Sequence, residues 1–433
     1  MSQTFAISTL GCKVNLYESE AYYALLVNAG YREVPFTEQA DIYIINTCAV
    51  TNAAAAKSRQ RIAQAKKRNA DALLCVVGCF AQTEEDVLRK RFEVDIIVGN
   101  SEKPQLLSFI QNYKKENPVN RVKKEERNLD FEHLPVHHFE GHTRAFLKIQ
   151  DGCNQFCSYC IIPLARGNER SLNFDTVLSE AKLLVESGHK EIVLTGIHTG
   201  RYCDSSGKTL DDVLREMNKI EELKRIRISS IEITEITDFM IQQIANSTKI
   251  AKHLHIPLQS GTNTILGKMN RPYTTEEFKA KIDYIRTCIP DISISTDIIC
   301  GFPYEKESEY QNALQFVKTC QFSFLHVFPF SVRKGTEAET MSEQIPSGTK
   351  KERAAELLKY SDELRNQYCQ SLIGKQVYVL VEKRKGAYLS GYCEEYMEVY
   401  FVGDDSSINQ IIPVEIVEIS NGKCYGIQES GAK

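Results

Sequence analysis

The sequence lacks the features that mark several classes of protein. No apolar run approaches the length of a membrane-spanning helix. The first residues, MSQTFAISTLGCKVN, do not have the basic segment followed by an apolar segment that is typical of a secretion signal. Hydrophobic residues make up 42% of the chain and charged residues 25%, which excludes a mostly disordered protein. We therefore expect a globular, cytoplasmic protein that does not bind membranes.

The chain also lacks an excess of positive charge. Its 53 Lys and Arg residues face 57 Asp and Glu residues, so the net charge is −4. Any binding to nucleic acid must therefore depend on local basic patches. Residues 53–70 contain several cations and no acidic residue, and this patch predicts either a contact with RNA phosphates or a solvated helix face. Within the patch we single out Lys57 and Arg61 as candidate RNA-binding residues.

Length and sequence pattern together predict three domains and one linker. A chain of 433 residues suggests roughly three domains at about 150 residues each. Residues 1–115 alternate strand-length apolar runs with helical patterns, which predicts βαβ units and an open parallel α/β sheet. Strands are expected at 5–9, 41–47, 72–78 and 94–100, with helices at 15–30, 52–69 and 83–92. Residues 116–140 are charged and lack periodicity, so we expect a linker.

The alternation begins again at residue 141 and continues to residue 370. Six strands separated by helices, with a long helix at the end, predict an incomplete (β/α)6 barrel, because eight repeats are needed for closure. Residues 371–433 show short strands separated by turns, which predicts a small all-β, OB-like domain. The expected fold class is therefore α/β with a C-terminal all-β domain.

Four of the nine histidines lie in or beside the predicted linker: His133, His137, His138 and His142. Their spacing allows a zinc site. Pro135 and Gly141 interrupt any helix that would align them, so we favour a solvated linker.

Cysteine is the informative residue type, with 14 in the chain. In a reduced compartment, closely spaced cysteines more often bind metal or carry out redox chemistry than form disulfides. Cys153, Cys157 and Cys160 form a C-x3-C-x2-C motif at the end of the first strand of the predicted barrel. Three thiolates can hold three irons of a cubane cluster and leave the fourth iron open for S-adenosylmethionine, which electron transfer then cleaves to a 5′-deoxyadenosyl radical.

The alternative for this motif is a structural zinc site. Structural zinc needs four ligands, and no fourth Cys or His lies within the loop. Barrel active sites also lie at the carboxyl ends of strands, where this loop is expected. We therefore favour the radical cluster.

A second set of cysteines is dispersed through the first domain. Cys12, Cys48 and Cys79 each follow the carboxyl end of a predicted strand, and those ends border the ligand crevice of a parallel sheet. The position alone leaves two interpretations open, namely a shared metal centre or three unrelated buried cysteines. Cys75 lies inside a strand and is expected in the core.

These segments resemble the methylthiotransferase family of radical S-adenosylmethionine enzymes. The resemblance extends over essentially the whole chain and rests on TLGCKVN, INTCAVT, VGCFAQ, QDGCNQFCSYCIIPLARG, HIPLQSG, MNRPYT and STDIICGFP. TLGCKVN and QDGCNQFCSYC are most similar to the subgroup that modifies N6-threonylcarbamoyladenosine in tRNA. One departure is Leu164, where the family commonly has an aromatic residue.

The resemblance implies two [4Fe-4S] clusters and S-adenosyl-L-methionine as cofactors. The C-x3-C-x2-C cysteines match the radical cluster, and the three dispersed cysteines match an auxiliary cluster that carries the sulfur to be inserted. The implied reaction uses two molecules of S-adenosylmethionine, one to methylate that sulfur and one to activate the adenine C2–H bond. The implied partners are the anticodon loop of tRNA, with the modified adenosine at position 37, and an electron donor such as a flavodoxin or ferredoxin.

The resemblance also points to S-adenosylmethionine contacts at the ends of barrel strands. Each of them has the alternative role of filling the barrel interior or forming a turn. The residues are Thr195, Gly196, Gln259, Ser260, Thr296 and Asp297. His253 and His255 share one face of a strand, and we expect them to be barrel core rather than catalytic.

The C-terminal segment resembles the TRAM domain of these enzymes, but it is not basic: residues 371–433 carry a net charge of −3. If it touches RNA, the expected contacts are a loop with three successive cations and nearby aromatic residues that stack on bases. The alternative for these tyrosines is a half-buried strand position. The residues are Lys383, Arg384, Lys385, Tyr388, Tyr392 and Tyr396.

The sequence therefore predicts an enzyme that installs a methylthio group on tRNA N6-threonylcarbamoyladenosine. Within the same class, the substrate could instead be isopentenyladenosine in tRNA or a ribosomal-protein side chain. In another class, the chain would be a non-catalytic iron–sulfur protein that binds RNA. The complete cysteine motif argues against that last alternative.

Overall fold

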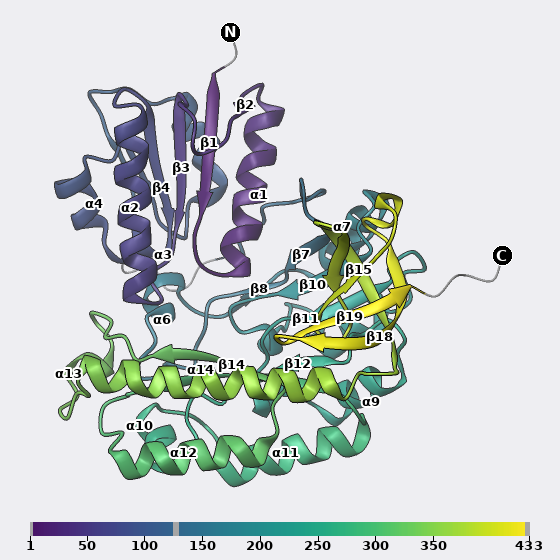
Figure 1. The fold of residues 1–433 in the computed structure, drawn as a ribbon. Coiled ribbons are helices and arrows are strands. Elements are labelled where there is room, and N and C mark those ends of the chain that lie inside the picture. Colours follow the sequence, from purple (N-terminus) through teal and green to yellow (C-terminus); the bar gives the residue numbers. More distant parts are fainter. Residues whose placement is uncertain (1–2, 124–129, 429–433) are drawn as a thin grey trace.

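The computed structural model describes residues 3–123 and 130–428, and three β-containing units follow one another along the chain (Figure 1). Residues 124–129 of the predicted linker and residues 429–433 of the predicted C-terminal domain lie outside the described residues. Within the described ranges, no helix combines the length and the apolar character needed to cross a membrane.

The first unit is an open, fully parallel six-stranded sheet with the strand order β2-β1-β3-β4-β5-β6. Its strands are β1 (Thr4–Thr9), β2 (Arg32–Glu33), β3 (Ile42–Thr47), β4 (Leu73–Gly78), β5 (Ile96–Val98) and β6 (Val119–Arg121). Its helices are α1 (Lys13–Asn28), α2 (Asn52–Arg68), α3 (Cys79–Thr83), α4 (Glu85–Phe92) and α5 (Leu106–Gln111). Every residue of β3 is buried, as expected for a central strand that is covered on both faces.

The order of the strands fixes where a ligand can bind. The chain leaves β1 to form β2 on one side and then returns to form β3 on the other. In an open parallel sheet, this reversal creates a crevice at the carboxyl ends of the strands. Residues that follow β1 and β3 therefore face one another across this crevice.

The predicted linker is more ordered than expected. Its first part forms β6, which pairs in parallel with β5. Leu134, Val136 and Phe139 are buried, and the Leu134 carbonyl accepts a hydrogen bond of 2.7 Å from the Tyr17 hydroxyl. The predicted linker therefore contains a short strand and buried side chains, which the sequence did not indicate because its apolar residues are too few and too irregularly spaced to show a period.

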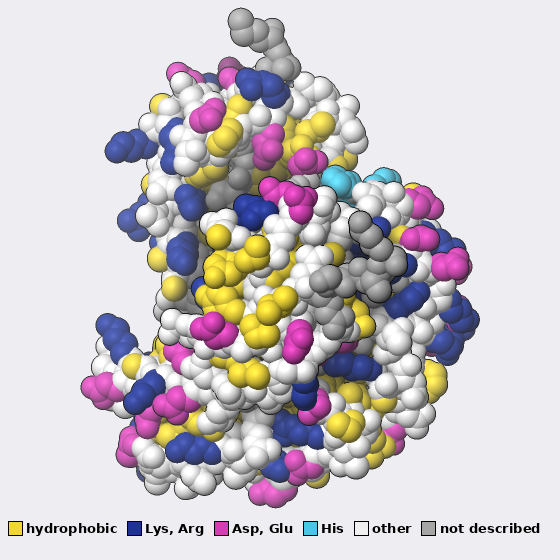
Figure 2. All heavy atoms as spheres, turned by 45° about the vertical axis from the view of Figure 1, so that its right-hand side comes forward, with side chains coloured by type: hydrophobic (Ala, Val, Ile, Leu, Met, Phe, Trp, Pro, Cys, Tyr) yellow, Lys and Arg dark blue, Asp and Glu magenta, His cyan; other side chains and the backbone are white. Residues whose placement is uncertain are grey.

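The linker histidines do not form a metal site among the described residues. All four are exposed at the surface, and Figure 2 shows histidine side chains where the N-terminal unit meets the rest of the protein. His133 contacts Glu180, and the rings of His138 and His189 lie 5.1 Å apart. These contacts tie the segment to its surroundings.

The second unit is an incomplete barrel of six parallel strands. Its strands are β7 (Arg144–Lys148), β10 (Glu191–Thr195), β11 (Arg225–Ile228), β12 (His253–His255), β13 (Ser293–Cys300) and β14 (Phe324–Pro329). Two three-stranded sheets, β11-β10-β7 and β12-β13-β14, are joined by parallel bridges from Ile226 to Ile250 and from Ser230 to His255. The barrel is open between β7 and β14, which confirms the predicted fold.

Helices cover the outside of this barrel. They are α7 (Phe174–Glu186), α8 (Leu210–Met217), α9 (Asp238–Asn246), α10 (Asn263–Lys268), α11 (Thr275–Cys288), α12 (Glu307–Cys320), α13 (Glu337–Thr340) and α14 (Ser347–Gln370). The long α14 crosses the front of the barrel in Figure 1 and packs against β14. A short pair, β8 (Gln150–Asp151) and β9 (Arg170–Ser171), encloses the C-x3-C-x2-C loop and the short helix α6 (Ile162–Arg166).

The third unit is a closed five-stranded barrel with the order β15-β16-β17-β19-β18. Its strands are β15 (Gln376–Lys385), β16 (Tyr388–Tyr392), β17 (Glu398–Phe401), β18 (Ile411–Ser420) and β19 (Lys423–Gln428). Alternate residues such as Val379, Val399 and Phe401 are fully buried in its core. This architecture confirms the predicted small all-β domain.

A buried ionic clamp fixes the small barrel to the large one. Glu191 pairs with Arg225 at 3.1 Å and with Arg227 at 2.8 Å, and both arginines also donate to backbone carbonyls of the small barrel. Burial alone would raise the pKa of Glu191, but the Arg227 and Arg225 guanidinium groups outweigh it and lower this pKa to about 2.

The clamp predicts a pH-dependent loss of stability. Because the folded-state pKa of Glu191 is depressed from 4.5 to about 2, its contribution is complete above pH 4.5 and disappears as the pH falls toward 2. Glu191→Gln leaves two buried arginines unpaired and is expected to cost about 3 kcal/mol of unfolding free energy at pH 7. Urea unfolding of the wild type and of Glu191→Gln at pH 7 and pH 3 measures the difference in their unfolding free energies. This difference should be smaller at pH 3.

The control for this variant is Glu216→Gln. Glu216 pairs with Lys219 at the surface. Its replacement by Gln should lower the unfolding free energy by less than about 0.5 kcal/mol. An equal, pH-independent effect of the two substitutions would show that the clamp has no special role.

Candidate functional site

The structure brings the three dispersed cysteines to one place. Cys12 precedes α1, Cys48 follows β3 and Cys79 begins α3, so all three lie at the carboxyl ends of adjacent strands. Gly11 has a φ of +104°, and a Cβ built there would lie 3.0 Å from the Cys48 Sγ. Only glycine allows this close approach, so the loop before Cys12 rests directly on Cys48.

The chemistry of these thiols fits a metal centre. Burial, together with the neighbouring Cys79 and Cys12 thiols, raises the pKa of Cys48 to about 12. Thiols grouped in this way ionise more readily around a metal cation, so the group fits an iron–sulfur cluster. Cys75, by contrast, is fully buried in the core within β4, as the sequence predicts.

The C-x3-C-x2-C cysteines form a second close group at the mouth of the large barrel. The Cys160 backbone N–H donates to the Cys157 carbonyl at 2.9 Å, which folds the loop into a tight turn. Burial, together with the neighbouring Cys157 and Cys153, raises the pKa of Cys160 to about 12. This group also fits iron, because its thiols are set close together and only half-buried.

Charged side chains that the sequence interpretation missed lie against both groups. The Arg166 Nε lies 3.2 Å from the Cys79 Sγ, and an Arg271 Nη lies 3.1 Å from the Cys157 Sγ. The His198 Nδ1 lies 3.4 Å from the Cys153 Sγ, and Glu169 is also close to this pair. Arg166 and Arg271 lie within segments that carry the family resemblance, but no spacing rule predicts contacts over such sequence distances.

The six predicted S-adenosylmethionine contacts gather at the cysteine-bearing end of the barrel, but they differ in availability. The Thr195 hydroxyl donates to the Val193 carbonyl, and the Thr296 hydroxyl donates to the Ile256 carbonyl at 2.7 Å. Both threonines are buried and serve the barrel structure.

The other four residues are better placed for a ligand. Gln259 adopts a φ of +67° and is half-buried, and Asp297 pairs with His255 at 3.0 Å. The buried Ser260 Oγ has no hydrogen-bond partner within the described part of the chain. A Cβ at Gly196 would lie 3.0 Å from the Gln150 side chain, so the backbone passes close to the cysteine strand.

The two strand histidines have structural surroundings. His253 is buried between the rings of Phe324 and Tyr396, and burial lowers its pKa well below the usual value. His255 bonds to Ser295 and Asp297. Both agree with the predicted core role.

The predicted RNA-binding cations are only partly free. Lys57 is exposed on α2, whereas the guanidinium of Arg61 lies 5.5 Å from the Phe36 ring centre. The expected loop at 383–385 is in fact the end of β15. Arg384 there pairs with Asp405 at 2.6 Å and Lys385 with Glu398 at 2.5 Å.

The tyrosines of the small barrel also differ in whether their rings are packed against other residues or exposed to solvent. Tyr396 packs at the boundary with the large barrel, where its ring lies 5.0 Å from the His253 ring and 4.9 Å from the Arg227 Cζ. Tyr388 is 39% exposed and its ring lies 5.6 Å from that of Tyr425. Tyr388 therefore remains a candidate for base stacking, whereas Tyr396 serves the domain interface.

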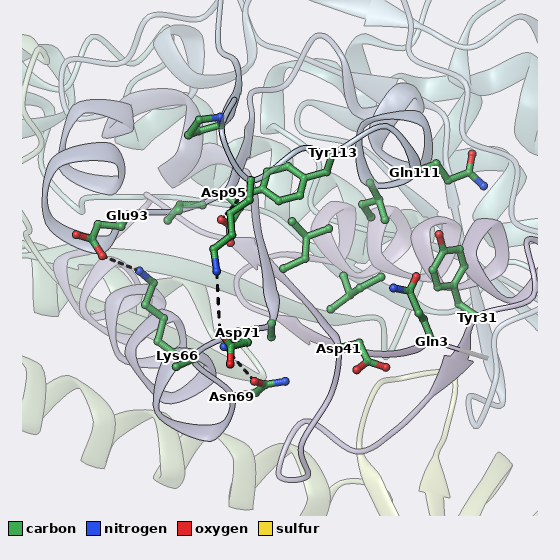
Figure 3. Close-up of a pocket in the computed structure, with 18 of the residues that line it drawn as sticks. Gln3, Tyr31, Asp41, Lys66, Asn69, Asp71, Glu93, Asp95, Gln111 and Tyr113 are labelled. Atoms are coloured by element: carbon green, nitrogen blue, oxygen red, sulfur yellow. Dashed lines mark hydrogen bonds and ion pairs between the residues drawn. The ribbon is translucent and has the colours of Figure 1, made fainter. Parts of the chain in front are cut away.

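A cavity of about 870 Å³ lies at the opposite edge of the N-terminal sheet (Figure 3). It is lined by residues at the amino ends of the strands, including Asp41, Leu73 and Asp95. Asp41 accepts hydrogen bonds from Thr4, and Asp95 accepts from the Leu74 N–H and the Tyr113 hydroxyl. Ligands of parallel sheets bind at the carboxyl ends, so this cavity is not the reaction site.

A cavity of about 440 Å³ lies instead beside both cysteine groups. Its lining includes Ala49, Phe80 and Ile161, the residues that follow Cys48, Cys79 and Cys160. It is within the volume range of small-molecule sites.

Comparisons with known proteins agree with this geometry. Residues 4–99 match uncharacterized protein family UPF0004, and residues 147–317 match the radical SAM superfamily. The chain is 42% identical over 423 residues to threonylcarbamoyladenosine tRNA methylthiotransferase MtaB of Bacillus subtilis (strain 168), covering 96% of this chain and 94% of that protein. The MtaB of Aquifex aeolicus (strain VF5) is 38% identical over 401 residues, covering 91% and 97%.

A second set of relatives is named for a different tRNA nucleoside. The tRNA-2-methylthio-N(6)-dimethylallyladenosine synthase of Thermoanaerobacter pseudethanolicus (strain ATCC 33223 / 39E) is 36% identical over 432 residues, covering 96% of this chain and 90% of that protein. Among solved structures, the radical S-adenosylmethionine methyltransferase TsrM from Kitasatospora setae aligns with a TM-score of 0.55 at 14% identity, covering 76% of this chain and 73% of that one. That likeness supports the fold.

Proposed function

The chain belongs to the methylthiotransferase family of radical S-adenosylmethionine enzymes, and we propose that it installs a 2-methylthio group on N6-threonylcarbamoyladenosine at position 37 of tRNA. The observation that carries the proposal is full-length similarity to enzymes named for this substrate, at 42% identity, combined with two converged cysteine groups. The reaction uses S-adenosylmethionine and iron–sulfur chemistry.

Each cysteine group has its own role in this proposal. Cys153, Cys157 and Cys160 hold the radical cluster, and the three dispersed cysteines hold the auxiliary cluster that carries sulfur. A [4Fe-4S] cluster with three protein ligands supplies an open iron for binding and one-electron chemistry. Four available residues then orient S-adenosylmethionine: Gly196 follows β10, Gln259 and Ser260 follow β12, and Asp297 lies within β13.

The protein's own contribution is placement and the exclusion of water. The cavity beside Ala49, Phe80 and Ile161 combines these apolar side chains with charged ones such as Arg59 and Arg333, and we assign it to the adenosine and its polar substituents. The target nucleoside is already unpaired in the anticodon loop, so its presentation costs less than extracting a base from a duplex. The electron donor we expect is a flavodoxin or ferredoxin, and a tRNA substrate places the protein in the cytoplasm.

RNA binding should depend on the few free cations. Lys57 on α2 and Lys383 on β15 have no side-chain partner in the described residues and lie in different domains. Each phosphate contact that is lost should weaken tRNA binding and flatten its log–log salt dependence by about 0.7–0.9. Affinity across a salt series measures this for Lys57→Ala/Arg61→Ala and Lys383→Ala.

The matched control is Arg384→Ala, because Arg384 is already held by Asp405. It should change the salt slope less than Lys383→Ala does. Unchanged slopes in both test variants would show that α2 and the end of β15 are solvated faces.

The function is tested by nucleoside mass spectrometry of tRNA from a deletion strain and its parent. The deletion should remove 2-methylthio-N6-threonylcarbamoyladenosine and leave the unmethylthiolated nucleoside in its place. Loss of the 2-methylthio isopentenyl nucleoside instead would favour the other named substrate. Unchanged tRNA would refute the proposal.

A further inference from the structure

Arg166 links the chain segment of the C-x3-C-x2-C loop to the dispersed cysteines through one fully buried guanidinium. It is the last residue of α6, directly after the C-x3-C-x2-C loop, and it is 0% exposed. Its Nε lies 3.2 Å from the Cys79 Sγ, and its Nη2 lies 2.7 Å from the Asn15 Oδ1. The Cys12 thiol lies 3.8 Å from that same Asn15 oxygen. A residue of the radical-loop segment therefore contacts Cys79 directly and Cys12 through the Asn15 side chain.

The other side of the guanidinium is anchored by carboxylates. Its Nη1 lies 3.0 Å from Glu18 in the N-terminal unit and 3.0 Å from Asp151 at the start of the cysteine loop. Both carboxylates are completely buried. An arginine guanidinium stays protonated in proteins, so these carboxylates pair with a permanent positive charge.

The buried cluster carries more positive than negative charge. Its cations are Lys103, Lys148, Arg166 and Arg170, and its carboxylates are Glu18, Glu132 and Asp151. Four cations therefore face three carboxylates in a region closed to solvent. A buried excess of positive charge needs a further anion nearby, and the Cys79 sulfur is the group that Arg166 faces.

We propose that Arg166 is a positioning residue of the reaction, an inference that rests on the proposed auxiliary cluster at Cys12, Cys48 and Cys79. Arg166 donates Nε–H to the Cys79 sulfur and holds that cysteine group against the radical loop. Hydrogen bonds to cluster sulfurs and nearby positive charge raise the reduction potential of an iron–sulfur cluster. The planar guanidinium has five N–H donors and bonds to all four of its partners at once, which a lysine ammonium cannot do. The partners are Cys79, Asn15, Glu18 and Asp151.

Arg271 provides a matched comparison at the other group. Its Nη1 lies 3.1 Å from the Cys157 Sγ, and it is anchored by Glu232 and by the Tyr273 hydroxyl at 3.1 Å. Each cysteine group thus has one buried arginine that donates to one of its sulfurs. The side-chain partners of Arg271 are Tyr273, Cys157 and Glu232, so its replacement should leave the auxiliary cluster unchanged.

The test uses the full-length chain with Cys153, Cys157 and Cys160 replaced by Ala, so that only the auxiliary cluster remains. A redox titration followed by electron paramagnetic resonance then compares three versions of this protein: Arg166 unchanged, Arg166→Lys and Arg166→Gln. The potential should become more negative in that order, because lysine keeps the charge and loses the fork, whereas glutamine loses both. Arg271→Lys in the same background should leave the potential unchanged.

A second measurement covers variants that lose the cluster. In the chain with all its cysteines, Arg166→Lys should form 5′-deoxyadenosine but lower methylthio transfer about 10- to 100-fold. Loss of auxiliary iron in Arg166→Lys but not in Arg271→Lys also supports the positioning role. Iron that is retained at an unchanged potential, with normal transfer, overturns it. Absence of iron from the triple-Ala protein before Arg166 is changed would instead refute the proposed auxiliary cluster.

Discussion

Simultaneous replacement of Cys153, Cys157 and Cys160 with Ala is expected to remove about half of the iron and to abolish S-adenosylmethionine cleavage. Two cubane clusters hold about eight irons per chain, and this variant loses the ligands of one of them. The auxiliary cysteines lie in another domain and keep their contacts with Asn15 and Arg166. Iron analysis and chromatography of 5′-deoxyadenosine after anaerobic reduction measure the two effects.

The formation of 5′-deoxyadenosine distinguishes an enzyme from a non-catalytic RNA-binding protein. A non-catalytic iron–sulfur protein would form no 5′-deoxyadenosine even with all its cysteines present. Full retention of iron in the triple variant would contradict the assignment of the C-x3-C-x2-C loop as a cluster site. Unchanged binding of tRNA would show that the domains still fold.

Replacement of Cys12, Cys48 and Cys79 with Ala should abolish methylthio transfer and leave S-adenosylmethionine cleavage intact. The radical cluster and its loop remain, so 5′-deoxyadenosine still forms, but no methylthio product accompanies it. The thiols converge at the crevice of the N-terminal sheet, and their loss removes the site for the transferred sulfur. Nucleoside mass spectrometry and 5′-deoxyadenosine analysis on the same reaction mixture measure the uncoupling.

Cys75→Ala is the matched control for this variant. Cys75 lies in β4, four residues before Cys79, but its side chain is fully buried in the core. Its replacement should keep both clusters and cost at most about 1 kcal/mol of stability. Wild-type methylthio transfer in the Cys12, Cys48 and Cys79 variant would refute the sulfur-carrying role.

The fold was predictable because its local signals agree with one another. Each predicted strand of the N-terminal unit is within two residues of an observed one at its start, and α2 begins at the predicted residue, Asn52. Apolar runs, helical periods and turn residues all indicate the same elements there. β6 was missed because it is a three-residue edge strand, too short for a two-residue period to show.

The site was predictable in its cysteines but not in their neighbours. Strand ends are visible in the sequence, so Cys12, Cys48 and Cys79 could be placed at one edge of a sheet. The contacts of Arg166 with Glu18 and Asn15 join residues about 150 positions apart, and no local pattern encodes such pairs. The ion pairs of Arg384 and Lys385 were hidden for the same reason, since Asp405 and Glu398 are on other segments.

The buried clamp of Glu191, Arg225 and Arg227 holds the small barrel in one position relative to the large barrel. Because its backbone carbonyls are held by arginines of the large barrel, the two units present their surfaces at one separation. A tRNA that contacts both barrels would therefore have to bridge one fixed distance between them, and this distance would not depend on the identity of its bases.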